Sequence, residues 1–143
     1  MAAVFEEGGI RFRYPENWTL EREANEAGWT VSVQSPGTAF LLVSLREDLP
    51  TTDELADETL AALRSEYPDL EADEALDTLA GQPAVGHEIR FFSFDLTNTC
   101  WTRSFYTSQG TALVLWQTND LELDAVEPVL RAICASLTLT DED

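Results

Sequence analysis

The sequence predicts an α+β fold, in which one twisted antiparallel β-sheet of about six to eight strands is sandwiched by two main helices. Two observations indicate this class. Apolar and polar residues alternate along most of the chain, but in two stretches the apolar residues recur at helical spacing. Short turn sequences join the strand-like stretches, and such turns connect antiparallel strands, whereas parallel strands need long crossovers. Residues 1–143 are expected to form a single domain, with residues 1–7 and 141–143 as frayed ends.

The first part of the chain is expected to be a meander of strands. A Gly-Gly turn precedes a segment in which apolar and basic residues alternate, and Pro15 then withholds a backbone donor and begins a connection. The predicted strands are Ile10–Tyr14, a strand beginning at Trp18, Trp29–Val33 and Ala39–Arg46. The last strand is apolar on both faces at Phe40–Val43, which indicates a central strand that is covered on two sides.

Two segments have helical signals. Thr51 and Glu54 have the spacing of a capping box, and the apolar residues that follow predict an amphipathic helix over Asp53–Glu66, which Pro68 ends. Near the C-terminus, Asp124 is the expected N-cap of a second helix. Its apolar stripe consists of Val126, Val129, Leu130 and Ile133.

Between the two helices, the pattern returns to that of strands. An acidic loop is expected after Pro68, and hairpin turns are expected at Thr97–Asn98 and Gln109–Gly110. The predicted strands are a short Leu76–Leu79, then Ala84–Leu96, Cys100–Ser108 and Ala112–Thr118, with a short final strand within Ser136–Thr140. The helices therefore interrupt a sheet whose internal connections are hairpins.

Acidic residues dominate the charge of the chain. Asp and Glu number 27, the eight basic residues are all Arg, and the formal net charge is −19. Binding to nucleic acid or to an anionic membrane through a basic patch is disfavoured, because phosphate neutralisation needs clustered Lys and Arg. A basic or apolar protein partner remains open, with a monomer or a homodimer as the expected assembly.

Metal binding and cofactor binding have no sequence support. Cys100 and Cys134 are far apart and are expected to be buried, and His87 is the single histidine, so no zinc spacing occurs. The segment from Asp69 resembles a calcium loop only superficially, because Glu74 stands where the loop needs Gly and Ala80 stands where it needs Glu. Phosphate loops and dinucleotide fingerprints do not occur. We therefore expect no metal and no cofactor.

An enzyme is disfavoured on similar grounds. A serine or cysteine triad has to use His87, which is expected to be structural or at the surface, and nothing singles out two of the many carboxylates. A hydrolase that uses His87 or paired acids is kept as an alternative of another class.

The N-terminal residues lack the basic and apolar regions of a secretory signal, and no apolar run is long enough to cross a membrane. The expected location is the cytoplasm.

Four residues are candidates for a partner-binding surface: Trp18, Arg90, Trp101 and Arg103. Tryptophan and arginine are enriched where proteins dock, because a large ring or a planar guanidinium offers much contact area at low entropic cost. The competing interpretation is structural. The tryptophans would then fill the core, and each arginine would pair with an acid such as Asp95 or Glu88.

Four segments together resemble the PsbP-like superfamily: the strand and turn from Ile10 to Trp18, Ser35-Pro36 before an apolar strand, the turn from Leu79 to Ala84, and the closing helix that ends at Ala135–Leu137. The resemblance covers nearly the whole chain, roughly residues 8 to 140. It implies a twisted antiparallel sheet sandwiched by helices, which agrees with the periodicity. The superfamily includes an extrinsic photosystem II subunit, a Ran-binding nuclear import factor and many small bacterial proteins.

The resemblance implies a binding role more than a reaction. Members of the superfamily mostly bind proteins, and the family has no catalytic residues to transfer. One bacterial branch consists of chaperones that hold the apolar segments of type VI secretion effectors, so a chaperone or adaptor of this kind is an alternative function. This chain lacks the targeting segment or lipobox of the photosynthetic and lipoprotein branches. We therefore expect a non-enzymatic, cytoplasmic protein-binding domain.

Overall fold

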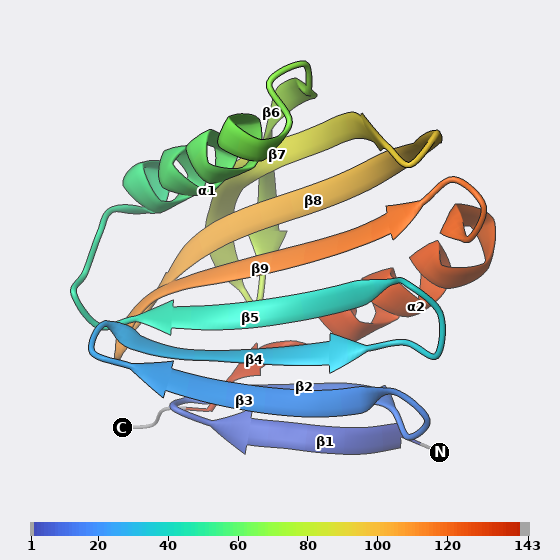
Figure 1. Ribbon diagram of the computed structural model, residues 1–143. Coiled ribbons are helices and arrows are strands. Elements are labelled where there is room, and N and C mark those ends of the chain that lie inside the picture. Colours follow the sequence, from blue (N-terminus) through green and yellow to red (C-terminus); the bar gives the residue numbers. More distant parts are fainter. Residues whose placement is uncertain (1, 141–143) are drawn as a thin grey trace.

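The computed structural model describes residues 2–140 and has the α+β architecture expected from the sequence (Figure 1). Within these residues, ten strands form two antiparallel sheets, and two helices pack against them. The helices are α1 (Thr52–Glu66) and α2 (Leu123–Ala135). The strands are β1 (Ala2–Glu7), β2 (Ile10–Pro15), β3 (Thr19–Asn25), β4 (Gly28–Gln34), β5 (Phe40–Arg46), β6 (Glu71–Leu79), β7 (Gln82–Ser93), β8 (Leu96–Thr107), β9 (Gly110–Asn119) and β10 (Thr138–Leu139).

The main sheet has seven strands in the order β3-β4-β5-β9-β8-β7-β6, and every neighbouring pair is antiparallel. Short turns join all neighbours except β5 and β9, between which the chain runs through α1 and the strands β6 to β8. The prediction that β5 is covered on both faces is confirmed. Leu41 and Val43 belong to the core on one face, and Phe40 and Leu42 pack on the other.

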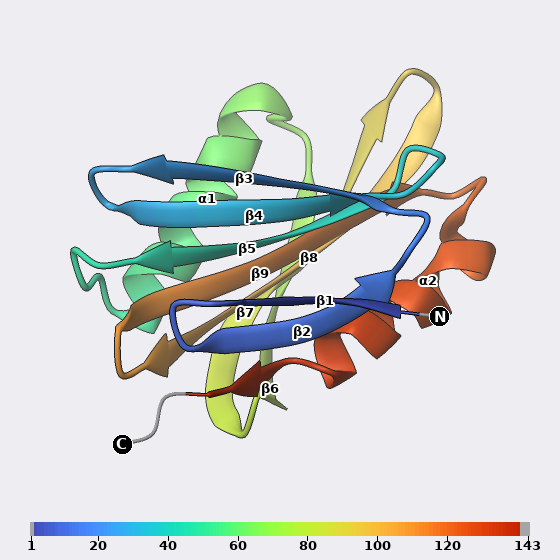
Figure 2. The same cartoon turned by 90° about the horizontal axis from the view of Figure 1, so that it is seen from below.

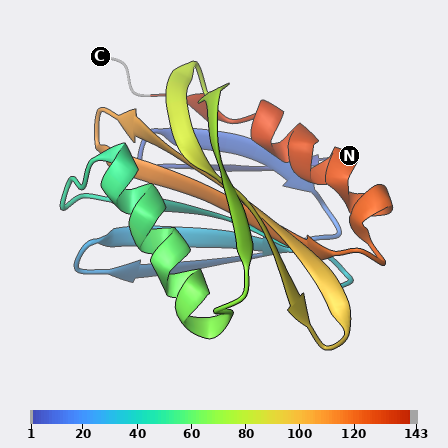
Figure 3. The ribbon, with the colours of Figure 1, turned by 90° about the horizontal axis from the view of Figure 1, so that it is seen from above.

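Helix α1 covers one face of the main sheet, over β7, β8 and β9 (Figure 3). The predicted capping box is present, because Thr51 Oγ1 accepts the Glu54 N–H at 3.0 Å and the Glu54 carboxylate accepts the Thr51 N–H at 2.9 Å. The helix ends at Glu66, and its C-cap residue Tyr67 directly precedes Pro68. A small core lies on this face of the sheet and consists of Leu70, Ile89, Phe91, Cys100 and Leu115.

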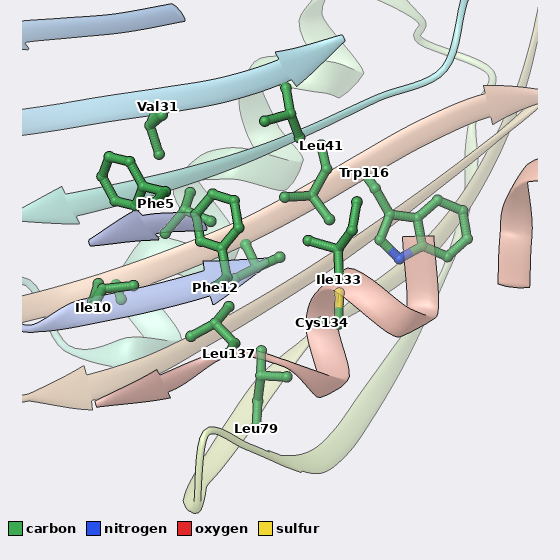
Figure 4. Close-up of a cluster of buried hydrophobic side chains, with 14 of the residues drawn as sticks. Phe5, Ile10, Phe12, Val31, Leu41, Leu79, Trp116, Ile133, Cys134 and Leu137 are labelled. Carbon is green, nitrogen blue, oxygen red and sulfur yellow. The ribbon is translucent and has the colours of Figure 1, made fainter. Parts of the chain in front are cut away.

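Helix α2 and a three-stranded sheet, ordered β1-β2-β10, cover the opposite face. The small sheet runs alongside α2 below the main sheet (Figure 2). The larger core lies between them (Figure 4). It joins side chains from all three layers, including Phe12 of β2, Trp116 of β9 and Ile133 of α2. Each helix therefore has its own core on its own face of the main sheet.

The N-terminal residues are not frayed, contrary to the sequence-based expectation. Residues 2–7 form β1, which pairs with β2 along its whole length around the Gly8–Gly9 turn. Phe5 is buried, and its ring stacks on Phe12 with centroids 5.1 Å apart, so the strand is held by side-chain packing as well as by backbone pairing. Residue 1 and residues 141–143 lie outside the described residues, and so does the expectation of a frayed C-terminus.

The predicted short strand Leu76–Leu79 is present but longer than expected, because it is the end of the nine-residue strand β6, which begins at Glu71. The acidic loop expected after Pro68 is therefore wrong from residue 71 onward. Its acidic side chains are compatible with a strand because β6 is at the edge of the sheet, where side chains remain in water. The next hairpin turn is at Phe94–Asp95 and not at Thr97–Asn98, and the turn after it is at Ser108–Gln109. Strand β8 therefore begins at Leu96, earlier than the sequence predicted.

The start of α2 also differs from the expectation. Glu122 occupies the N-cap position without a side-chain capping bond, and Asp124 lies inside the first turn. The chain turns earlier because the Asn119 Oδ1 accepts the N–H groups of Leu121 and Glu122 at 3.0 and 3.2 Å. The Glu122 carboxylate is engaged by Thr38, whose hydroxyl donates to it at 2.8 Å. The helix start is thus fixed by contacts outside the helix.

Candidate partner-binding site

Three of the four candidate residues lie in the interior of the chain. Trp18, Trp101 and the side chain of Arg103 are 8, 7 and 2% exposed. The Arg103 guanidinium is fully engaged within the chain, with Asp77 at 2.9 Å, Glu88 at 3.3 Å and the ring centroid of Trp101 at 4.3 Å. Pairing with Glu88 is the structural alternative that the sequence suggested. These three residues offer little accessible surface.

Arg90 is the one candidate that lies beside a hollow in the surface. Its side chain is 47% exposed and forms an ion pair of 3.6 Å with Asp73 on the neighbouring strand β6. The hollow, which we call the hairpin groove, has a volume of about 440 Å³ and lies among the end of α1, the start of β6 and the β7–β8 hairpin. It is lined by Glu66, Tyr67, Pro68, Asp69, Leu70, Glu71, Arg90, Phe91, Phe92 and Thr97.

A stacked aromatic pair forms part of this groove. The rings of Tyr67 and Phe91 stack with centroids 4.0 Å apart and an interplanar angle of 20°. Both residues also line a second hollow of about 280 Å³, to which Phe94, Leu96 and other residues of the sheet contribute. The two hollows therefore share the Tyr67–Phe91 pair, and the tip of the β7–β8 hairpin borders both of them.

The tip of this hairpin exposes two large aromatic side chains. Phe92 is 76% exposed and Phe94 is 96% exposed. The hairpin projects beside the C-terminal end of α1 (Figures 2 and 3). The described part of the chain leaves both rings largely uncovered. Two exposed Phe residues at one hairpin tip contrast with the other aromatic residues of the chain, most of which are buried. Exposed apolar groups that gather in one place are typical of interaction sites.

The backbone of the turn is strained. Phe94 and Asp95 have φ angles of 54° and 62°, in the left-handed region that hairpin turns usually fill with Asn-Gly. A bulky side chain in this region is a rare outlier that costs of order 1–3 kcal/mol. Such strain is concentrated at functional sites. The turn therefore holds Phe94 outward at a cost in stability.

Sequence reasoning missed this turn because Phe-Asp is not a turn dipeptide. The run Phe91–Phe94 was assigned to the strand as a whole, and the turn was placed at Thr97–Asn98, where polar residues occur. One signal was present in the sequence. Three Phe residues within four positions exceed what one face of a strand can bury, because alternate side chains point to opposite faces.

His87 occupies a separate hollow of about 290 Å³ between α1 and the strands β6 and β7. The residue is 5% exposed, and its Nδ1 is buried without a hydrogen-bond partner among the described residues. Its backbone N–H donates to Thr102 Oγ1 at 3.0 Å. Asp53, Asp57 and Glu74 also line this hollow. Within residues 2–140, this ring is not hydrogen bonded to a hydroxyl or thiol group, and no three potential metal ligands gather.

The two cysteines are free and buried in different cores, Cys100 on the α1 face and Cys134 on the α2 face. Burial raises the pKa of each thiol to about 12. Both groups are therefore neutral near pH 7 and poor nucleophiles.

In the described part of the chain, neither helix has the length and apolar character that a membrane-spanning helix needs.

The comparisons with known proteins support the fold. The chain is similar to cyanobacterial PsbP from Synechocystis sp. PCC 6803, with 12% identity, a TM-score of 0.68, and 96% of this chain and 92% of that chain covered. It is also similar to PA94 of Pseudomonas aeruginosa, a protein of unknown function (13% identity, TM-score 0.57, 99% and 98% covered). A third similar structure is LpqN of Mycobacterium tuberculosis, involved in cell envelope biogenesis (16% identity, TM-score 0.56, 99% and 91% covered).

These similarities establish a PsbP-like fold and confirm the resemblance seen in the sequence at the level of the fold. No protein-family model matches the sequence, and no curated protein matches it either. Identities of 12 to 16% carry no residue roles from these proteins to this chain.

Proposed function

We propose that this PsbP-like chain is a non-enzymatic protein-binding domain and that the β7–β8 hairpin, together with the hairpin groove, binds a partner polypeptide. The observation that carries the proposal is the exposure of Phe92 and Phe94 on a strained turn beside a groove that already contains aromatic side chains. A protein that only had to fold would gain stability from a different residue at position 94. The exposed ring at this position is therefore better explained by binding than by folding.

Burial of the exposed rings would contribute favourably to the free energy of binding. Complete burial of a Phe side chain contributes about 1.5–3 kcal/mol. Aromatic residues that enter a desolvated pocket often dominate the binding energy of an interface. Phe92 and Phe94 would supply two such anchors, and the Tyr67–Phe91 pair would supply a preformed apolar surface between them and the end of α1.

Charge selects the kind of partner. Three acids, Glu66, Asp69 and Glu71, line the hairpin groove, and its one base, Arg90, already pairs with Asp73. The whole chain has a net charge of −19. We therefore propose a partner segment in which apolar side chains are flanked by Lys or Arg, because such a segment would satisfy both the rings and the carboxylates.

Neither alternative function gains a specific observation. A membrane-spanning segment needs about 20 apolar residues and about 30 Å of cover, whereas the hairpin groove has a volume of about 440 Å³ and is lined by three carboxylates. A hydrolase that uses His87 would need a nucleophile hydrogen bonded to the ring, and the described residues place none there. A non-enzymatic role therefore agrees best with the geometry.

The proposal is tested by selecting peptides from a random displayed library on the wild-type protein. We expect the enriched peptides to combine aromatic or aliphatic residues with Lys or Arg, and to bind the Phe94→Asn variant at least about tenfold more weakly, a loss of about 1.4 kcal/mol. Asn tolerates the left-handed backbone at this position, so the variant should remain folded. Selection that yields no binders, or binders unaffected by Phe94→Asn, would contradict the proposal.

Leu49 provides a matched control. It is also exposed, at 69%, and also has a positive φ angle, of 60°, but it lies in the connection between β5 and α1. Leu49→Asn removes an exposed apolar side chain from the same backbone conformation. We expect the selected peptides to bind this variant as they bind the wild type, because the hairpin tip is unchanged. A nonspecific effect of lost surface hydrophobicity would instead weaken binding to both variants.

A further inference from the structure

Strand β6 is an open edge of the main sheet. It pairs with β7 from Glu71 opposite Arg90 to Leu79 opposite Gln82, and no strand of the described chain pairs with its other side (Figure 3). Most of its residues are exposed, and Leu76 is 81% exposed. A strand of nine residues with no proline and a free edge offers a template on which a further strand can pair.

The hairpin register shows which backbone groups are free. The strands β6 and β7 are joined by the two-residue turn Ala80–Gly81, whose φ angles of 55° and 77° are those of a tight hairpin. In such a hairpin the two flanking residues, Leu79 and Gln82, form a hydrogen-bonded pair through both of their backbone groups. Hydrogen-bonded pairs alternate along the strands. The residues whose N–H and C=O groups point away from β7 are consequently Ala72, Glu74, Leu76 and Thr78.

Pro83 supports this register. It lies opposite Thr78, at a position where β7 donates no hydrogen bond to β6, so the missing N–H of proline costs the hairpin nothing. The free edge of β6 therefore presents the N–H and C=O groups of four residues, which lie at every second position of the strand. That row is long enough to pair with a short extended segment.

The charges beside this edge favour a basic partner. Glu74 of β6 and the α1 residues Asp53 and Asp57 line one hollow of about 290 Å³ at the edge, and none of them forms an ion pair with arginine among the described residues. On the other face of β6, Asp73 and Asp77 are paired with Arg90 and Arg103. Glu71 is the one carboxylate on that face of β6 without an arginine partner, whereas all three carboxylates at the hollow on the α1 side are unpaired among the described residues.

We propose that the β6 edge binds an extended, basic segment of a partner protein as an additional antiparallel or parallel strand, with its Lys or Arg side chains over the hollow formed by Asp53, Asp57 and Glu74. A second copy of this chain is a poor occupant, because pairing two β6 strands would bring Glu71, Asp73, Glu74 and Asp77 against their own kind. This surface is separate from the tip of the β7–β8 hairpin and does not depend on what the tip binds.

The opposite edge of the sheet provides an internal comparison. Strand β3 is also exposed, but it carries both signs of charge, and its Arg22 is engaged with Glu7 of β1 through two hydrogen bonds. Its hairpin has the two-residue turn Glu26–Ala27, so by the same register Ala24 has an outward N–H. Ala24→Pro and Leu76→Pro therefore remove the same kind of group from two different edges.

The test uses a synthetic peptide of alternating Lys and Thr residues and an analogue with Glu in place of Lys, both titrated into the full chain labelled with ¹⁵N at physiological salt. We expect the Lys peptide to shift the β6 amide resonances and to protect the N–H groups of Glu74, Leu76 and Thr78 from exchange. Leu76→Pro should weaken binding at least about tenfold although it keeps every charge, whereas Ala24→Pro and Phe94→Asn should bind as the wild type does.

A second variant covers the case in which Leu76→Pro does not fold. Glu74→Lys should weaken binding of the Lys peptide and strengthen binding of the Glu analogue. The proposal is overturned if the Lys peptide binds without protecting β6, if it binds Leu76→Pro and the wild type equally, or if sedimentation shows a dimer that Leu76→Pro disrupts. Because Phe94→Asn keeps the β6 edge intact, loss of hairpin binding and loss of edge binding are distinguishable.

Discussion

Arg103 is a candidate for partner binding in the sequence but a buried structural residue in the fold. Its guanidinium is buried at the centre of the β6–β7–β8 layer, where it contacts Asp77, Glu88 and the ring of Trp101. Both carboxylates are about half exposed, at 50 and 52%, so they remain hydrated while the arginine does not. The residue therefore joins three neighbouring strands through its ion pairs and is not available to bind a partner.

Arg103→Ala is expected to reduce the free energy of unfolding by about 2–3 kcal/mol, because it removes a buried side chain together with its hydrogen bonds. Arg90→Ala, on the neighbouring strand, is expected to change it by about 0.5 kcal/mol or less, since that side chain is half exposed and its ion pair is in water. Urea denaturation of the two variants checks the difference. Equal effects would show that the buried contacts of Arg103 do not stabilise the fold.

The buried thiols predict how stability depends on alkaline pH. Burial raises the pKa of Cys100 and Cys134 to about 12, whereas an unburied thiol titrates near the ordinary value of 9.0. Between these two values the native state retains protons that the unfolded state has lost, so stability falls as pH rises through this window. The upper limit for each thiol is about 1.4 kcal/mol per pH unit.

Unfolding midpoints in urea measured from pH 8 to pH 11 test this expectation. The double variant Cys100→Ala, Cys134→Ala should be less stable near neutral pH but should lose stability less steeply above the pKa of a free thiol. Ionising tyrosines are common to both proteins and cancel in the comparison. Parallel slopes in the two proteins would mean that the thiols are not protected by burial.

Among the elements, the turn at Phe94–Asp95 is where local sequence preference and structure disagree. Turns that matched their sequence signals, such as Gly8–Gly9, lie where Gly supplies the positive φ. Helix α1 was predictable because Thr51 and Glu54 satisfy its free N–H groups locally. At Phe94 the tertiary structure imposes a conformation that the residue itself disfavours, so a local pattern cannot reveal it.

Relief of this strain should stabilise the hairpin. Phe94→Asn is expected to raise the free energy of unfolding by about 1 kcal/mol, because Asn adopts the left-handed conformation at lower cost and little burial is lost at a residue that is 96% exposed. Leu49→Asn should give a gain of similar size. Chemical denaturation measures both. A destabilised Phe94→Asn variant would indicate that the ring is packed and not presented.

The first part of strand β6, before the predicted short strand Leu76–Leu79, escaped prediction for a different physical reason. Strand signals rely on one buried face, and an edge strand that leaves nearly all its residues in water has none. Only Leu79, at its end, belongs to a core. The strand exists because β7 supplies backbone partners along nine residues, a long-range effect that composition does not encode. For the same reason, the free edge of β6 could not be predicted from the sequence.

The candidate site was predictable only in part. Trp and Arg were sensible residue types, but exposure decides whether such a residue binds a partner or fills the core, and exposure is a property of the whole fold. Trp18, Trp101 and Arg103 lie inside, and Arg90 lies at the hairpin groove. The exposed rings of Phe92 and Phe94 were missed because apolar residues are assigned to the core by default.

The charge of the whole molecule is a further determinant of stability. Eight ion pairs with arginine occur among the described residues, and most of their acidic partners are well exposed. Exposed pairs of this kind contribute little, and the remaining acids repel one another across a chain with a net charge of −19. Repulsion between like charges at the surface therefore opposes folding.

Salt should relieve this repulsion. The melting temperature is expected to rise when NaCl is increased from low concentration to about 0.5 M, because the screening length then becomes shorter than the spacing of most surface charges. Differential scanning calorimetry at several salt concentrations checks the trend. A flat or falling melting temperature would show that the acids are paired locally and do not act as a common field.

If the β7–β8 hairpin tip is the surface that binds a partner, a library-selected peptide added to the labelled protein should change the amide and aromatic chemical shifts of that region. We expect perturbations that centre on residues 91–96 and Tyr67 and vanish in Phe94→Asn. Perturbations centred instead on α2 and the β1–β2–β10 sheet, with the hairpin unchanged, would contradict this expectation.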